Sequence, residues 1–141
     1  MANTVCTSFK SELLSGVHDF ATAGDTFKLS LYTSSSTINN ASTTVYTTSD
    51  EVADSGSYAA GGGSLANQAV STDGTTAIVD FDDLSFTSAT ITARYALIYN
   101  STDSNKAVCV LDFGTDQTSP SGTFTIQFPS AGASTAIIRV A

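Results

Sequence analysis

Beyond its first 25 residues, the chain alternates apolar and polar side chains in short runs, and this period of two constrains the fold most strongly. Phe27, Leu29 and Leu31 show the alternation, which recurs around residues 76–81 and 124–128. Successive side chains of a strand point to opposite faces, so the pattern predicts half-buried strands. Turn-forming residues separate the runs every eight to twelve residues or so. We expect an all-β fold, either an antiparallel β-sandwich or a jelly roll of seven to eight strands.

The second half of the chain gives the clearest strands. Residues 95–99 form a continuous apolar run, which predicts a central strand covered on both faces. Residues 100–105 are polar and turn-forming, so we expect a hairpin between this strand and a partner at residues 106–113. A last strand is predicted at about residues 135–140.

A single helix is predicted near the N-terminus. An apolar stripe at helical spacing runs through residues 8–20 and comprises Phe9, Leu13, Leu14, Val17 and Phe20. A lone amphipathic helix on a β domain must bury that stripe somewhere. We therefore expect one β-sandwich domain, 1–141, with 1–24 as a helical interface segment. Deleting the first 20 residues should then leave the β domain folded and weaken attachment to a neighbour.

The charge balance argues against anionic partners. The 141 residues include 13 acidic and 5 basic side chains, for a net charge of −8, and 43 are Ser or Thr. Nucleic-acid binding needs clustered Lys and Arg, whereas these five are scattered, and the same charge disfavours an anionic membrane surface. No apolar run is long enough to span a membrane. We expect partners to be proteins, with neither nucleic acid nor membrane among them.

The N-terminus and the two cysteines indicate a reducing compartment. The first five residues lack a basic region followed by an apolar run, so no secretory signal is visible and synthesis in a cytoplasm is expected. Cys6 and Cys109 are therefore predicted to be buried thiols, although a disulfide is the alternative. No cysteine and histidine cluster suggests zinc.

His18 is the only histidine and hence the natural candidate for a catalytic base. Such a base needs a nucleophile and an orienting acid. Asp19 is adjacent, but neighbours on a helix point to different faces, and the G-x-S-x-G motif is absent. We therefore expect His18 on the helix surface or at an interface, and we predict neither an enzyme nor a cofactor.

Acidic residues are densest at Asp80, Asp82 and Asp83. Alternation places Asp80 and Asp82 on one face, so a calcium ion shared by their carboxylates is one interpretation. A solvated turn between strands is the other, and it is favoured because the glycine and distal glutamate of an EF-hand loop are missing. Asp112 and Asp116 are likewise interpreted as solvated side chains. We therefore predict no metal-binding residue.

Tyrosines in or beside polar loops are candidates for a protein interface. Tyr32, Tyr46 and Tyr58 are either ordinary surface tyrosines or contact area for a partner. With the helical stripe they complete the predicted interface set, which is Phe9, Leu13, Val17, Phe20, Tyr32, Tyr46 and Tyr58. The run of three glycines at residues 61–63 predicts either a flexible tip or a close approach of another backbone.

Several sequence blocks together resemble small virion proteins of tailed bacteriophages. The similarity covers most of the chain in order and is weakest at about residues 34–74. The blocks are residues 8–20 (SFKSELLSGVHDF), 25–32 (DTFKLSLY), 96–101 (ALIYNS) and 106–108 (KAV).

The resemblance implies a capsid cement or decoration protein. Such a protein binds the outside of the major capsid shell and clamps neighbouring capsomers, and it carries no catalytic residues. We accordingly expect the major capsid protein as partner, self-association as a dimer or trimer, and a place on the capsid exterior. The alternatives are a tail, neck or fibre-associated virion protein, or a module that binds a host glycan through Tyr46 or Tyr58.

Overall fold

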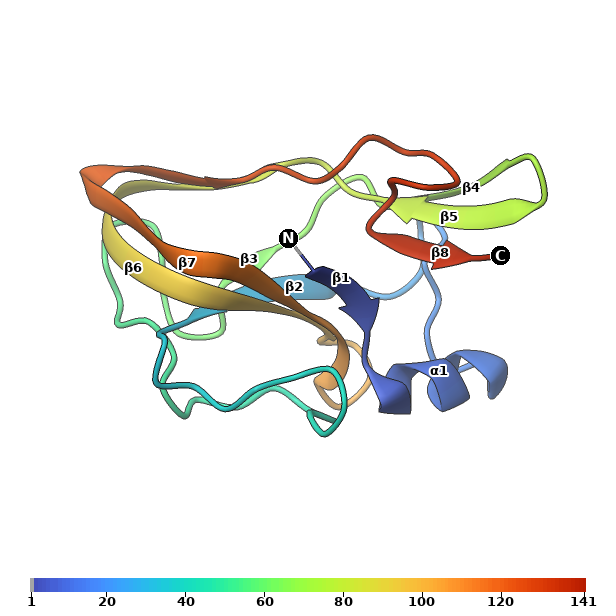
Figure 1. The fold of residues 1–141 in the computed structure, drawn as a ribbon, viewed down its shortest axis with the longest axis horizontal. Helices are drawn as coiled ribbons and strands as arrows, with labels where there is room; N and C mark the ends of the chain where they lie inside the picture. Colours follow the sequence, from blue (N-terminus) through green and yellow to red (C-terminus); the bar gives the residue numbers. More distant parts are fainter. Residues whose placement is uncertain (1) are drawn as a thin grey trace.

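The computed structural model describes residues 2–141, with side chains from Val5 onward, and shows two antiparallel sheets and one short helix (Figure 1). The chain is mostly β, as the alternation predicted. The larger sheet has the order β1-β7-β6-β2-β3, and the smaller sheet has the order β4-β5-β8. The elements are β1 (Ala2–Val5), α1 (Thr7–Leu14), β2 (Phe27–Tyr32), β3 (Gly63–Ser64), β4 (Ala69–Asp73), β5 (Thr76–Asp80), β6 (Leu84–Asn100), β7 (Lys106–Ile126) and β8 (Ile138–Val140).

One long hairpin, β6 and β7, dominates the larger sheet. The two strands span 17 and 21 residues, so the prediction of short strands separated by turns is wrong here. The register shifts at four points along the hairpin, and Ser88, Gly114 and Ser121 have positive φ. These irregularities let both strands bend without ending, and the distal half doubles back over the rest of the sheet (Figure 1). Residues expected to form turns therefore form bends.

The middle of the larger sheet is buried on both faces. Residues 96–99 of β6 lie between β2 and β7 and are inaccessible to solvent, which confirms the predicted central strand, and the predicted hairpin turn follows it. β2 was expected to be half-buried, but five of its six residues are buried. The cause is the long loop after β2: it pairs with the edge of the strand, where the N–H of Val52 bonds to the carbonyl of Leu31 at 2.9 Å, and it contacts one face, where the hydroxyl of Tyr32 donates to the carbonyl of Thr47 at 2.7 Å.

The helix is shorter than its apolar stripe suggested. It ends at Leu14 because Gly16, with φ of +74°, turns the chain out of the helix directly afterwards. No helix among residues 2–141 has the length and apolar character required to cross a bilayer.

The N-terminal segment belongs to the core of its own chain. β1 was not predicted from the sequence. It pairs antiparallel with β7. Phe9 is buried, and Phe20 stacks on Phe27 with ring centroids 4.2 Å apart. The expectation that this segment leaves its apolar stripe free for a neighbour is therefore wrong, since Phe9 and Phe20 pack almost entirely against the rest of the chain.

Two smaller predictions are confirmed. Cys6 and Cys109 are free and buried, as predicted from the sequence. The triple glycine marks a close approach, because a Cβ on Gly62 would lie 1.7 Å from the carbonyl oxygen of Leu29. The positive φ of Gly62, +77°, adds a second reason for glycine at that position.

Candidate interaction surface

His18 is buried rather than displayed on a helix surface, which corrects the prediction. It follows α1 in an irregular segment, and its ring centroid lies 4.9 Å from that of Phe9 and 6.3 Å from that of Phe27. Its Nε2 lies 3.3 Å from Glu12 Oε1, and its Nδ1 lies 3.1 Å from Asn100 Nδ2. Sequence could not reveal this site because Asn100 is 82 positions away.

Asn100 fixes the tautomer of the His18 ring. Its Oδ1 accepts the backbone N–H groups of Thr102 and Asp103, so its Nδ2 faces His18 Nδ1 and, at 2.8 Å, Asp25 Oδ2. An amide nitrogen only donates, so Nδ1 accepts and the neutral ring carries its proton on Nε2, which donates to Glu12. Both ring nitrogens are thus held by structural partners.

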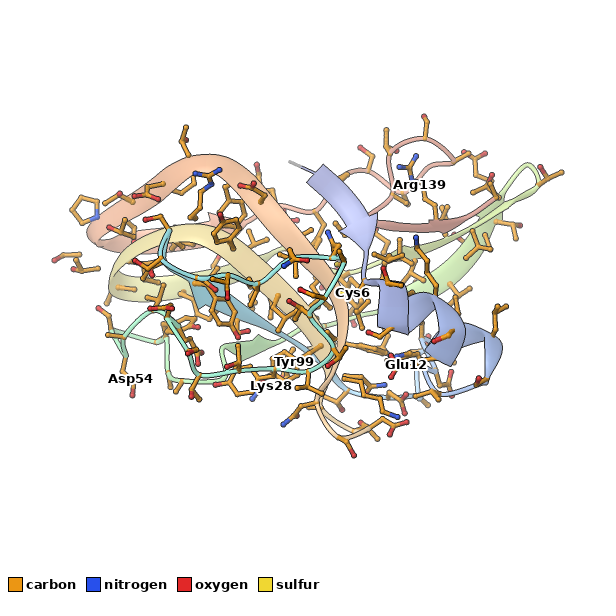
Figure 2. All side chains as sticks on the ribbon, turned by 60° about the horizontal axis from the view of Figure 1, so that its bottom comes forward. Cys6, Glu12, Lys28, Asp54, Tyr99 and Arg139 are labelled. Atoms are coloured by element: carbon orange, nitrogen blue, oxygen red, sulfur yellow. The ribbon has the colours of Figure 1, made fainter. Side chains whose placement is uncertain are left out.

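This polar cluster joins the N-terminal segment to the β6–β7 turn. Glu12 projects from α1 toward that turn (Figure 2), and its Oε2 lies 3.9 Å from the Nζ of Lys106. Asp25 accepts the N–H of Asp19 at 2.9 Å as well as the amide of Asn100. The cluster therefore holds α1 and the segment after it against the larger sheet.

The positioned segment forms one wall of an apolar groove of about 570 Å³. The other wall is the small sheet, which lies above α1 in Figure 1. The groove is lined from the N-terminal side by Phe9, Leu13, His18, Asp19, Phe20, Ala21 and Thr22, and from the small sheet by Val70, Ala77, Ile78, Val79, Ile138 and Val140.

Strand register explains why the small sheet presents apolar side chains to the groove. Val70, Val79 and Ile138 lie side by side on adjacent strands, and Ala77 and Val140 form the next row on the same face. Val70 is 56% exposed and Val140 is 51% exposed, so the rim of the groove leaves apolar surface in water. Apolar surface concentrated on a groove marks a site for contact with another molecule.

The predicted interface residues divide into two groups. Leu13 lines the groove and is half-buried, and Val17 and Tyr46 are half-buried elsewhere. The remaining four are buried in the chain's own core, although Phe9 and Phe20 also form part of the groove lining, so the prediction that these side chains are exposed contact area for a partner is wrong. They are Phe9, Phe20, Tyr32 and Tyr58.

The buried tyrosines fasten the long loop after β2. Tyr46 and Tyr58 donate to the two carboxylate oxygens of Glu51 at 2.5 and 2.8 Å, and the N–H of Gly61 adds a bond of 2.7 Å. Tyr32 donates to the carbonyl of Thr47 at 2.7 Å. These hydroxyls have partners inside the molecule, so their rings are buried at little cost in lost hydrogen bonds.

Replacing Glu51 with alanine should lower the free energy of unfolding by about 2 kcal/mol or more, because three donors lose a charged acceptor. Chemical denaturation measures the change. The exposed Ser49→Ala is the control and should stay within about 0.5 kcal/mol of the wild type. Equal stability of the two variants would show that Glu51 does not fasten the loop.

The carboxylates of Asp82 and Asp83 accept hydrogen bonds within the fold. Asp82 accepts the side-chain amide of Asn67, and Asp83 accepts the N–H of Phe128 at 2.8 Å. Within residues 2–141, no cluster of three or more His, Cys, Asp or Glu side chains has the arrangement to hold a metal ion.

Asp112 and Asp116, the other acidic pair considered, lie on β7. The carboxylate of Asp112 lies 2.7 Å from the Nε of Arg94, and this guanidinium holds the pKa of Asp112 below its usual range. The pair fastens β7 to β6. Asp116 is exposed on the bent part of β7.

Comparison with known proteins adds no family to this description. No family model, curated protein or solved structure matches the chain significantly.

Proposed function

We propose that this chain is a non-enzymatic structural protein of a tailed-bacteriophage particle, a capsid cement or decoration protein. It binds the major capsid protein on the outside of the shell and clamps neighbouring capsomers, after synthesis in the host cytoplasm. The observation that carries the proposal is the apolar groove, with its half-exposed Val70 and Val140, because such surface suits contact with protein. The resemblance of the sequence blocks to small virion proteins of tailed bacteriophages is the reason for assigning the protein to a phage particle.

The fold we propose for this role is an antiparallel β-sandwich. The bent hairpin supports it, because the distal halves of β6 and β7 pass over the sheet that their proximal halves form (Figure 1). Two hairpins, β4–β5 and β6–β7, supply one strand pair in each sheet, whereas β1–β7, β2–β6 and β5–β8 join strands that are distant in sequence.

Placement in the particle is the first test. Mass spectrometry and electron microscopy of purified particles should find hundreds of copies arranged with the symmetry of the capsid. About a dozen copies or fewer at the tail or neck would overturn the cement role in favour of a tail, neck or fibre-associated protein. The glycan-binding alternative is weaker because Tyr58, one of its two proposed contacts, is buried.

Attachment through the groove is tested with two matched valines. Val140→Asp places a charge in the groove and should weaken binding to capsids that lack the protein by about tenfold or more, which is about 1.4 kcal/mol. Val45→Asp is the control, since Val45 is similarly exposed, at 47% against 51%, and lies outside the groove. Sedimentation of capsids with bound protein measures both. Equal binding by the two variants would exclude the groove as the attachment site.

A further inference from the structure

The outer edge of the small sheet is open along β4. All five residues of β4 are exposed, and its register with β5 is regular from Ala69 to Asp73. A two-residue loop, Gly74-Thr75, joins β4 to β5, so the residues that flank it, Asp73 and Thr76, form a hydrogen-bonded pair. Hydrogen-bonded and non-hydrogen-bonded pairs alternate along an antiparallel ladder, so Val70 and Thr72 belong to non-hydrogen-bonded pairs with β5. The peptide groups of Val70 and Thr72 consequently point away from β5. No hydrogen bond within residues 2–141 occupies them.

β4 also lacks the features that protect the edges at β3, β8 and the distal part of β7. Exposed edges are normally blunted by lysine, proline, bulges or shortness. β3 has two residues and β8 has three, while the open distal part of β7 carries Pro120 and shifts of register. β4 contains neither lysine nor proline and has no bulge. An edge in this condition is complementary to another extended strand.

We propose that β4 pairs antiparallel with β4 of a second copy of this chain, about a two-fold axis at Ser71. This inference rests on the proposed structural role, which includes self-association, and names the surface that makes it. The pairing joins the two small sheets into one sheet of six strands. Val70 of each copy then lies opposite the second copy's Thr72, and their outward peptide groups form four hydrogen bonds across the axis.

The contact brings no like charges close together, although each copy has a net charge of −8. The only charged residue of β4 is Asp73, which the two-fold axis places opposite Ala69 of the second copy. The two Asp73 residues lie four positions apart, about 13 Å along the strand, which exceeds the screening length of about 8 Å at physiological ionic strength. The centre of the contact is neutral, and the row that contains Val70 meets Thr72 of the second copy and, beyond it, Ala77 and Val140 of that copy.

The two-fold axis determines which cysteine substitution on β4 can link the two copies by a disulfide. Ser71 faces itself as a non-hydrogen-bonded pair, with a Cα separation of about 4.5 Å, so Ser71→Cys should form a disulfide-linked dimer under mild oxidation. Thr72→Cys is the matched control on the same exposed strand. Thr72 of one copy and Thr72 of the second copy are offset by two positions along the paired strands. Their Cα atoms lie about 8 Å apart, which is too far for a disulfide. Non-reducing electrophoresis compares the two, and equal crosslinking would overturn the register.

Solution measurements on the full-length chain test the pairing without a crosslink. Light scattering should give twice the 14.5 kDa mass of the chain at high concentration. Thr72→Pro removes an outward N–H and should restore the single mass with an unchanged circular dichroism spectrum, since proline is tolerated at an open edge. A wild-type chain that stays monomeric would overturn the pairing. That result would leave the particle location untouched, because copy number in the particle is measured separately.

Discussion

Replacing Phe20 with alanine is expected to lower the free energy of unfolding by about 3–5 kcal/mol. Phe20 lies outside any helix or strand, yet it is only 5% exposed. Its ring stacks on Phe27 and meets Phe9 edge-on with centroids 5.9 Å apart. Truncation leaves a cavity at the point where the N-terminal segment, β2 and the groove meet.

Leu14 provides the matched control for this change. It comes from the same predicted apolar stripe, but it is 91% exposed, so Leu14→Ala should change the free energy of unfolding by no more than about 0.5 kcal/mol. Urea denaturation followed by circular dichroism measures both variants. Similar losses for the two would mean that the segment does not pack as described. The same packing predicts that deletion of the first 20 residues unfolds the chain, contrary to the expectation from sequence.

Two local patterns predicted the strands that form the centre of the fold. Alternation predicted β2, and the continuous apolar run at residues 95–99 predicted the buried half of β6, because a central strand needs apolar residues on both faces. The turn between β6 and β7 followed from a run of small polar residues. These features depend on local sequence, and local sequence was sufficient for them.

The parts that sequence missed depend on distant partners. Tyr32 and Tyr58 look like surface tyrosines until Thr47 and Glu51 supply partners for their hydroxyls. His18 likewise needs Asn100, which only the β6–β7 turn brings near. No local sequence pattern shows whether a tyrosine or histidine ring will be buried, because its partners come from distant parts of the chain.

β4 and the groove were missed for a different reason. Every residue of β4 is exposed, so it has no apolar alternation to detect. The one local signal was Gly74, because glycine is favoured at the first position of a two-residue hairpin loop. The bends in β6 and β7 were misinterpreted as turns because serine and glycine serve both purposes.

Raising the pH through the range of about 9 to 12 is expected to destabilise the fold strongly. Burial raises the pKa of the Cys6 thiol from 9.0 to about 11, and it raises those of Tyr32 and Tyr99 from 10.0 to about 12. Burial also raises the pKa of Cys109 and Tyr58. All five groups are shifted in the same direction, so their effects on stability accumulate.

The sign follows from proton binding in the two states. Between the ordinary and the raised pKa of each group, the unfolded chain has lost a proton that the folded chain keeps. Stability therefore falls as pH rises, starting near pH 9 with the thiols and continuing as the tyrosines ionise in the unfolded chain. Cys6 alone, shifted by about two pKa units, accounts for roughly 2–3 kcal/mol by pH 11.

Urea midpoints measured from pH 7 to pH 11 should be level up to about pH 8.5 and then decline. In Cys6→Ala the decline between pH 9 and 11 should be shallower, because one of the ionising groups is missing from the unfolded chain. Ultraviolet absorbance should show tyrosinate rising together with the loss of the circular dichroism signal. If thiolate and tyrosinate instead form at their ordinary pKa values while the native spectrum persists, these side chains are not buried as described, and the fastening of the loop after β2 by Tyr32 and Tyr58 would have to be abandoned.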